Sequence, residues 1–402
     1  METGAIVVGA HANGLGVIRA LGARGIPIAS IATRPFDIAQ HSRFVAERHA
    51  LPALHQRHEA LVELLEANAR RWDGWAVFPT SDDALTALAR HHERLSRSYR
   101  LPLQPWELMS QLVEKDGMDA LARRAGLELP ICYGAATRET AARCDLRYPV
   151  LVKPNQHDRL ISLFGAKLFL ARDAAELDTA ITRLERAEMP GLLFEFVPGP
   201  DSNIYVYCVY MDAAGEPSPG VTVRKLRQNP PRIGGARVAE IAPDEPRLRE
   251  ATVELLRRAG FRGMAFAEFK RDPRDGRFLF IEVNGRAVLF NGLLPPTGLD
   301  LVAMAWDDFV LGTPPRPRLT GWNGVWIHLQ ADLMCAVRYR RDERLGLAEL
   351  VAPYRRPARF GDWSAADPKP FLAQSALAAR GVLATWARGL RRARPDARAA
   401  AR

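Results

Sequence analysis

Two glutamates lie on either side of a predicted tight turn, and an asparagine and an arginine follow the second glutamate at alternating positions. The stretches MAFAEFKRD and RFLFIEVNGR flank the segment DPRDG at residues 272–276, and Asp-Gly between two alternating runs predicts a β-hairpin. The midpoint of Glu268 and Glu282 is residue 275, so a symmetric turn places the two carboxylates opposite each other, about 5 Å apart. Because side chains alternate between the faces of a strand, Glu282, Asn284 and Arg286 share one face.

Two carboxylates at this separation repel each other unless a positive group lies between them. One interpretation is a structural ion pair in which Lys270 or Arg286 neutralises one glutamate. The other is a site for a hard cation, with Glu268 and Glu282 as ligands and the Asn284 amide oxygen as a third. Oxygen-only ligands suit Mg²⁺, with Mn²⁺ as an alternative, and Mg²⁺ usually binds one or two carboxylates together with substrate phosphates. In that case Arg286 would stabilise negative charge on a phosphoryl group in transfer.

The lysines are few and clustered. Lys and Arg together number 56, of which only six are lysines: Lys115, Lys153, Lys167, Lys225, Lys270 and Lys369. A composition this biased replaces Lys by Arg wherever a generic positive charge suffices, so a retained lysine indicates a place that needs a compact, strongly hydrated charge. Five of the six lie between positions 115 and 270, and we expect the site to draw on this stretch.

Residues 281–286, with the sequence IEVNGR, resemble the metal-and-arginine signature of the ATP-grasp ligases, and Glu268 resembles its earlier glutamate. The usual family pattern is E-x-N-P-R, and here Gly285 replaces the proline. Three further motifs follow the family order over about 170 residues. The resemblance extends over about residues 1–312.

Three lysines carry the next part of the resemblance. The strand at residues 150–154, with the sequence VLVKP, resembles the family strand whose lysine, here Lys153, contacts ATP. Lys115 resembles the earlier family lysine. Lys225 begins the Lys-Leu-Arg sequence at residues 225–227 and matches a family position that faces the phosphates. The resemblance implies a catalytic role for Lys225, beside that of Arg286.

The remaining motif resembles the hinge that holds adenine through its backbone, with Glu195, Phe196 and Val197 in that role. The resemblance places Asp201 or Asn203 near the ribose. The usual glycine-rich lid loop is replaced by residues 155–167, where Lys167 is the expected phosphate contact.

The resemblance implies an ATP-dependent ligase of the carboxylate–amine branch. A substrate carboxylate would attack the γ-phosphate of Mg-ATP to give an acyl phosphate and ADP, and an amine would then displace phosphate to form an amide. Small-molecule, glycan-linked and peptide-linked carboxylates and amines are all open as substrates. The alternatives are an ATP-grasp enzyme that uses a thiol or bicarbonate, and a nucleotide-binding regulatory protein without ligase turnover.

The predicted fold class is α/β, of the α+β ATP-grasp type under the resemblance. Residues 1–105 alternate short apolar strands with helical stretches, which predicts a parallel sheet with helices on both faces in a pre-ATP-grasp domain. Residues 106–312 would form the ATP-grasp domain, with a central lid at about 116–190 and an antiparallel grasp sheet at about 191–312. Residues 313–402 would form a helical C-terminal extension with a basic tail.

Composition argues against several other classes. The 402 residues carry a net charge of +10, but no basic stripe with interleaved aromatic residues marks a nucleic-acid-binding surface. The four cysteines form no CxxC pair, so neither a disulfide framework nor a cysteine zinc site is indicated. No uncharged apolar run approaches the roughly 18 residues that a membrane helix needs, and we expect a cytoplasmic protein.

The C-terminal segment leaves two interpretations open. Apolar residues from Leu372 to Leu390, including Trp386, recur at spacings of three and four, which predicts one face of a helix near 371–393. Residues 388–402 add six arginines and one aspartate. The helix either docks on the body of the enzyme, or it rests with its basic tail on the inner face of an anionic membrane as a weak peripheral contact. A homodimer is a further open alternative.

Overall fold

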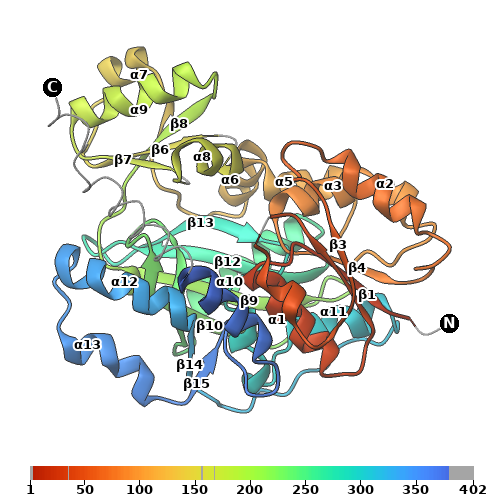
Figure 1. The fold of residues 1–402 in the computed structure, drawn as a ribbon. Coiled ribbons are helices and arrows are strands. Elements are labelled where there is room, and N and C mark those ends of the chain that lie inside the picture. The colour runs from red at the N-terminus through yellow and green to blue at the C-terminus, as the bar shows by residue number, and fades with distance from the viewer. Residues whose placement is uncertain (1–2, 35, 155–156, 167, 380–402) are drawn as a thin grey trace, which may run out of the picture.

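The computed structural model of the protein describes residues 3–34, 36–154, 157–166 and 168–379. It contains a parallel sheet near the N-terminus, a small antiparallel sheet and a large, mostly antiparallel sheet. Figure 1 shows the small sheet and its helices standing apart from the other two sheets.

The N-terminal domain alternates short strands with helices. Its elements are β1 (Ala5–Val8), α1 (Ala12–Gly22), β2 (Ile28–Ala32), the 3₁₀ helix η1 (Ile38–His41), β3 (Val45–Ala50), α2 (Glu59–Ala67), β4 (Ala76–Pro79), α3 (Asp82–Arg90) and α4 (His92–Leu95). The strands are parallel in the order β3-β2-β1-β4, which confirms the predicted parallel sheet. Every residue of β1, β2 and β4 is buried, as expected for a parallel sheet that is covered on both faces.

Two helices, α5 (Trp106–Val113) and α6 (Lys115–Arg124), lead from this domain to the lid. The lid consists of β5 (Cys132–Ala135), α7 (Arg138–Arg143), β6 (Val150–Pro154), α8 (His157–Phe164), β7 (Phe169–Ala171), α9 (Ala174–Arg186) and β8 (Gly191–Glu195). Its strands pair antiparallel in the order β5-β8-β6-β7. The lid has a small hydrophobic core of its own, built from one face of α9 and the inner face of β6 and β8, so it packs as a separate body.

The large sheet has the order β13-β12-β9-β10-β11-β14-β15. Its strands and accompanying helices are η2 (Asp201–Asn203), β9 (Ile204–Met211), β10 (Val221–Asn229), β11 (Gly235–Ile241), α10 (Pro246–Arg258), β12 (Gly263–Arg271), β13 (Phe278–Asn284), η3 (Asn291–Leu293), η4 (Pro295–Thr297), α11 (Leu301–Phe309), β14 (Val325–Ile327), α12 (Leu329–Asp342), α13 (Leu347–Val351), η5 (Ala352–Arg355) and β15 (Ala358–Phe360).

Alternating residues of β9 and β12 enter two different hydrophobic cores. Tyr207 and Val209 pack with α10 and with helices α2, α3, α5 and α6, whereas Val206 and Cys208 pack with α1 and α11. Both cores also include strands of the N-terminal sheet. The N-terminal domain and the large sheet are therefore joined through shared cores, which holds their facing edges in a fixed relation.

The structure corrects two predicted boundaries. The grasp sheet was expected to begin near residue 191, but Gly191–Glu195 pairs with β5 and β6 and belongs to the lid. An apolar run has the same pattern in either sheet, so composition alone cannot assign it. The region after residue 312 was expected to be a helical extension, yet Val325–Ile327 and Ala358–Phe360 extend the large sheet at one edge.

The chain is helical from residue 369 to residue 379, within the predicted C-terminal helix. The rest of that helix and the basic tail, residues 380–402, lie outside the described residues. In the part of the chain that the structure describes, no helix is both long enough and apolar enough to cross a membrane.

Candidate functional site

The hairpin formed by β12 and β13 places Glu268 directly opposite Glu282, as the spacing predicted. Nearer the turn the register changes by one residue, and Phe269 faces Phe280. The turn is therefore centred slightly earlier than predicted. An irregularity directly after Glu268 shifts the register by one residue, and this shift brings Glu268 opposite Glu282. Gly276 has a φ of 77°, the left-handed conformation that makes glycine favourable in this turn.

Glu268 is neutralised by a lysine from another strand. The Nζ of Lys225 on β10 lies 2.6 Å from Oε2 of Glu268, and both side chains are largely buried, with 9% and 14% exposed. Strand β9 separates β10 from β12, so the lysine reaches across it to the glutamate. Lys270 is not the partner, because its ammonium group donates to the backbone carbonyls of Gly199 and Pro200 at 3.3 and 3.4 Å.

Glu282 carries a second carboxylate into the same place. The Nδ2 of Asn284 donates a hydrogen bond to its Oε1 at 3.1 Å. Burial among surrounding protein atoms raises the pKa of Glu282, but Lys225, the Asn284 hydrogen bond and Lys153 outweigh this effect, so its pKa is lowered overall. Solvent still reaches the side chain. The carboxylate is thus ionised and accessible, as a cation ligand must be.

Two of the predicted ATP-contacting lysines come together over one aromatic ring. The Nζ atoms of Lys115, at the start of α6, and Lys153, on β6, lie 5.3 and 5.1 Å from the centre of the Phe194 ring. Burial and repulsion from Lys115 lower the pKa of Lys153, while Glu282 and Glu268 oppose this shift. Lys153 therefore lies within electrostatic reach of both glutamates, which joins the lid strand to the hairpin in one site.

Arg286 forms an ion pair with the N-terminal domain. Its Nε and Nη2 lie 2.7 and 2.8 Å from the two carboxylate oxygens of Asp82, the first residue of α3. Asp82 also lies close enough to Glu282 to raise the pKa of that carboxyl. Asp82 is a site residue that the sequence interpretation missed, because an acidic residue in the first turn of a helix is normal on helix-dipole grounds alone.

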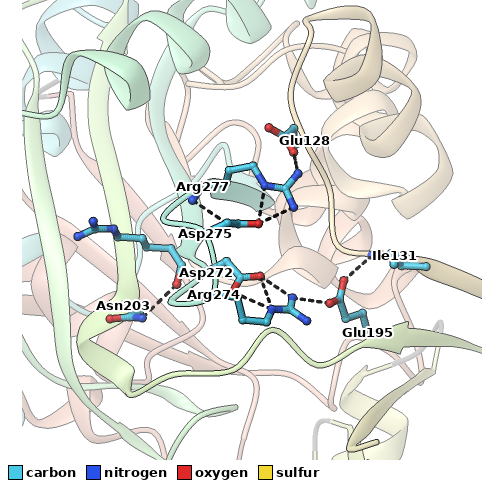
Figure 2. A network of polar contacts seen from close by, with 9 residues as sticks. Glu128, Ile131, Glu195, Asn203, Asp272, Arg274, Asp275 and Arg277 are labelled. Atoms are coloured by element: carbon cyan, nitrogen blue, oxygen red, sulfur yellow. Dashed lines mark hydrogen bonds and ion pairs between the residues drawn. The ribbon is translucent and has the colours of Figure 1, made fainter. Parts of the chain in front are cut away.

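The predicted hinge is tied to the β12–β13 turn through side chains. Figure 2 shows Arg274 in this turn between Asp272 and Glu195. The Nη2 of Arg274 lies 2.5 Å from Oε1 of Glu195. The backbone N–H of Glu195 donates to the carbonyl of Ile131 at 2.8 Å. Among the described residues, Phe196 forms no hydrogen bond with another backbone group. The backbone N–H and C=O of Phe196 are therefore available to a ligand.

Within the described part of the chain, Val197 likewise forms no hydrogen bond with another backbone group. Phe196 and Val197 are 9% and 6% exposed, so the segment is held firmly although its backbone is unpaired. Adenine recognition here stays a prediction, with residues 196–197 as its most suitable backbone groups.

Asp201, one of the two residues predicted near the ribose, has a carboxylate that is held by donors of the protein itself. Its carboxylate accepts hydrogen bonds from the backbone and side-chain amides of Gln228 at 2.9 and 2.8 Å and from the backbone of Arg232 at 2.7 Å. The hydroxyl of Tyr339 supplies a fourth donor. Four donors saturate a carboxylate, and Asp201 is only 4% exposed, so it holds the loop together.

Asn203 remains a candidate for the ribose contact. Its Nδ2 donates to the backbone carbonyl of Arg271 at 3.1 Å (Figure 2), which leaves its carbonyl oxygen as an acceptor. Lys167, the predicted lid contact to the phosphates, lies outside the described residues.

The donor set fits a Mg²⁺ ion that takes its remaining ligands from phosphates. Two carboxylate side chains and one amide lie beside lysines that would bind the same phosphates. Within the described residues, no group of three or more His, Cys, Asp or Glu side chains is arranged to hold a metal ion. A metal bound here would therefore depend on the nucleotide for part of its coordination.

Known proteins share both sequence and fold with this chain. Over 255 residues it is 22% identical to the D-aspartate ligase of Enterococcus faecium (strain Aus0004), and the match covers 60% of each chain. The chain thus spans about three fifths of the length of this curated relative. No known family profile matches the sequence.

Solved structures match over most of the chain. The L-amino acid ligase of Bacillus licheniformis superposes with a TM-score of 0.61 at 17% identity, covering 77% of this chain and 75% of that one. The biotin carboxylase domain of the Hydrogenobacter thermophilus 2-oxoglutarate carboxylase, in complex with MgADP, ADP and bicarbonate, gives 0.60 at 21% identity, covering 81% and 74%. The chain therefore has the predicted ATP-grasp fold.

Proposed function

We propose that this protein is an ATP-dependent carboxylate–amine ligase that forms an amide through an acyl phosphate. The observation that carries the proposal is the glutamate pair of the hairpin, with Lys225 on one glutamate and Asn284 on the other. Binding of a nucleotide alone would not need two carboxylates beside lysines, whereas phosphoryl transfer needs positions for both a cation and the phosphates.

The nucleotide would lie between the lid and the large sheet. Lys115 and Lys153 would neutralise its phosphates, and the backbone of Phe196 and Val197 would bind adenine. Glu268, Glu282 and Asn284 would hold Mg²⁺, which would neutralise negative charge on the phosphates. Complexes of the Hydrogenobacter biotin carboxylase domain with MgADP support this choice of cation and nucleotide.

The reaction would proceed in two balanced steps. A carboxylate oxygen of the first substrate forms a bond to the γ-phosphorus, and the bond from that phosphorus to ADP breaks, with the electron pair leaving on ADP. The amine nitrogen then bonds to the acyl carbon, and phosphate leaves with the electron pair of the C–O bond. An ammonium substrate loses two protons to water and phosphate in the process. Arg286 would stabilise the oxyanion and Lys225 the phosphates.

The deciding experiment measures ADP release from ATP and Mg²⁺ with a panel of carboxylates and amines, starting with D-aspartate because of the Enterococcus relative. We expect release only when a carboxylate and an amine are both present, together with the amide in the mass spectrum. Glu282→Gln should abolish turnover with the fold intact by circular dichroism. ADP release that depends on bicarbonate or a thiol, or tight ATP binding without any turnover, would refute the proposal.

Two further proposals concern the cellular setting. We propose that the basic residues 388–402 give a weak contact with an anionic membrane surface. Co-sedimentation with anionic vesicles, comparing the full chain with a 1–370 truncation, tests this contact, and equal binding by both forms would exclude it. A homodimer is proposed by analogy with the dimer of the Hydrogenobacter biotin carboxylase domain, and sedimentation equilibrium would test it.

A further inference from the structure

Arg237 is the extra residue of a β-bulge in the large sheet. The register of β10 and β11 skips it, since the pairs on either side are Arg227 with Val238 and Gln228 with Ala236. A bulge re-aims the side chain that it carries, and bulges are frequent beside active sites.

The bulge lies close to the candidate site. A Cβ atom placed on Gly235 would be 3.7 Å from Nη1 of Arg237 and 3.1 Å from Cδ1 of Leu289, so both side chains lie against this glycine. Leu289 is three residues after the signature Arg286. Lys225 is on the neighbouring strand, opposite the residue two positions after Arg237. The guanidinium group of Arg237 therefore borders the region between the signature loop and the phosphate-facing lysine.

Arg237 forms no ion pair within the described part of the chain. Its guanidinium group donates one hydrogen bond, from Nη1 to the backbone carbonyl of Ala236 at 3.0 Å, and its Nε is enclosed without a partner. Burial lowers the pKa of Arg237, because the charged form loses its water. A guanidinium group carries five N–H donors, so most of those on Arg237 lack a partner among the described residues.

The carboxylate that acts on Arg237, that of Asp332 in α12, is already engaged. Its two oxygens accept hydrogen bonds from Nε and Nη2 of Arg227 at 2.7 and 2.6 Å, and the hydroxyl of Tyr354 adds a third at 2.6 Å. Arg224 of the same strand pair has an ion pair of its own. Because a buried cation without a counter-ion is costly, Arg237 is suited to an anion that comes from outside the chain.

A second buried polar group lies beside Arg237. The backbone N–H of His328 donates to the carbonyl of Arg237 at 2.8 Å, and the nearest carboxylate to the ring, that of Asp362, is 3.8 Å from Nε2. Neither ring nitrogen has a hydrogen-bond partner among the described residues, although His328 is only 4% exposed. Burial lowers the pKa of His328 to about 4, so at pH 7 the ring is neutral and carries one N–H donor.

We propose that Arg237 binds a second carboxylate of the acyl donor, which makes the substrate a dicarboxylic acid. This inference rests on the proposed ligase function and deepens it by naming the substrate class. Arg286 serves the carboxylate that reacts, and the lysines at 115, 153 and 225 serve the phosphates. Arg237 is left for a group that carries charge but does not react, and its planar fork of donors matches a carboxylate through two hydrogen bonds.

The test measures formation of the acyl phosphate without an amine substrate. Hydroxylamine displaces phosphate from the acyl carbon and gives a hydroxamate. Dicarboxylic acids, beginning with D-aspartate, are compared with acids that lack one carboxylate, which for D-aspartate are D-alanine and β-alanine. For wild type we expect a kcat/KM for the dicarboxylic acid at least tenfold above that for either shorter acid. In Arg237→Met this preference should disappear, mainly through a KM for the dicarboxylic acid that rises at least tenfold.

Thermal unfolding separates this role from a structural one. Methionine removes a buried charge that has no counter-ion and keeps much of the side-chain volume, so Arg237→Met should melt at or above the wild-type temperature. The dicarboxylic acid should raise the melting temperature of wild type and not that of the variant. Calorimetric titration should show unchanged ATP affinity in Arg237→Met.

Arg224→Met is the matched control. Arg224 is on the neighbouring strand, and its side chain is 37% exposed and paired with Glu240. This variant should keep the wild-type KM for the dicarboxylic acid. Arg237→Lys should recover part of the loss, because it restores the charge without the fork.

The failures are distinguishable. Wild-type protein that turns over the shorter acids equally well, or an Arg237→Met variant that keeps the preference, would overturn the inference and leave the ligase intact. An Arg237→Met variant that melts well below wild type would show that Arg237 supports the fold, which also overturns it. Hydroxamate from none of the acids would refute the proposed function, and the inference with it.

Discussion

Replacing Lys225 by methionine tests the charge balance of the glutamate pair. Methionine keeps most of the length and volume of the side chain but removes the ammonium group that lies 2.6 Å from Glu268. Glu268 and Glu282 then face each other across the strand pair without this counter-charge. The variant should be less stable than wild type in the absence of divalent cations.

The expected size follows from the distance and the burial. Two unit charges about 5 Å apart interact with about 3 kcal/mol at an effective dielectric constant of about 20. Removing one partner of a buried ion pair costs about 3–5 kcal/mol, and the solvent access of Glu282 reduces this figure. We therefore expect the free energy of unfolding at pH 7.5 to fall by about 2–4 kcal/mol.

The decisive measurement adds Mg²⁺ alone, without nucleotide. If the two glutamates hold the cation, Mg²⁺ can replace the lost positive charge, and the variant should bind it more tightly than wild type does. A tenfold gain in affinity corresponds to about 1.4 kcal/mol of additional stabilisation at saturating Mg²⁺. The deficit of Lys225→Met should also shrink as the pH falls from 7.5 to 5.5, because repulsion raises the pKa of one glutamate and its protonation removes the repulsion.

Lys270→Met is the matched control. Lys270 is 5% exposed, and among the described residues it forms no ion pair and donates only to loop carbonyls. Its loss should destabilise the protein without creating a Mg²⁺-dependent recovery. Urea unfolding with and without Mg²⁺ compares the three proteins. The reasoning is refuted if Mg²⁺ stabilises Lys225→Met no more than it stabilises wild type.

Three other variants test separate parts of the structure. Lys153→Ala should weaken ATP binding at least tenfold by calorimetry, about 1.4 kcal/mol, and unchanged affinity would remove Lys153 from the nucleotide site. Arg274→Ala should cost about 1 kcal/mol, since Arg274 is 44% exposed, and should speed hydrogen exchange near Glu195; an unaltered exchange pattern would contradict the hinge contact. Burial lowers the pKa of His328 to about 4, so between about pH 6.5 and 4 the unfolded chain binds a proton that the folded chain does not, and stability falls as the pH falls. His328→Asn should flatten this dependence, worth up to about 3 kcal/mol, in urea unfolding, whereas the exposed control His41→Asn should keep the wild-type slope.

The hairpin could be predicted because its register is encoded locally. In two strands joined by one short turn, residues at equal distances from the turn lie opposite each other. The spacing of Glu268 and Glu282 was therefore enough to predict that they form a pair. Because side chains alternate between the two faces of a strand, the sequence also predicted that Asn284 shares a face with Glu282. The irregularity after Glu268 could not be predicted, since nothing in the sequence distinguishes the residue at which a strand pair slips by one.

The partners of the charged residues could not be predicted, because they come from other parts of the chain. Lys225 reaches Glu268 across an intervening strand, and this depends on the strand order of the sheet. Asp201 has the residue type of a ribose ligand, yet its neighbours in space saturate its carboxylate. Residue type indicates what a side chain is able to bind, and packing decides what it does bind.

Two contacts between separate bodies suggest how the site is assembled. Arg274 of the hairpin turn binds Glu195 at the end of the lid sheet, and Arg286 at the other end of the same hairpin strand binds Asp82 of the N-terminal domain. One β-hairpin is thus fixed to the lid at its turn and to the N-terminal domain at its base. The lid has its own core, whereas the N-terminal domain shares its cores with the large sheet. Movement of the lid would therefore change the nucleotide contacts of Lys153 while leaving the pair of Arg286 and Asp82 in place. The phosphate end of the site would open and close, whereas the end that carries Arg286 would stay preorganised.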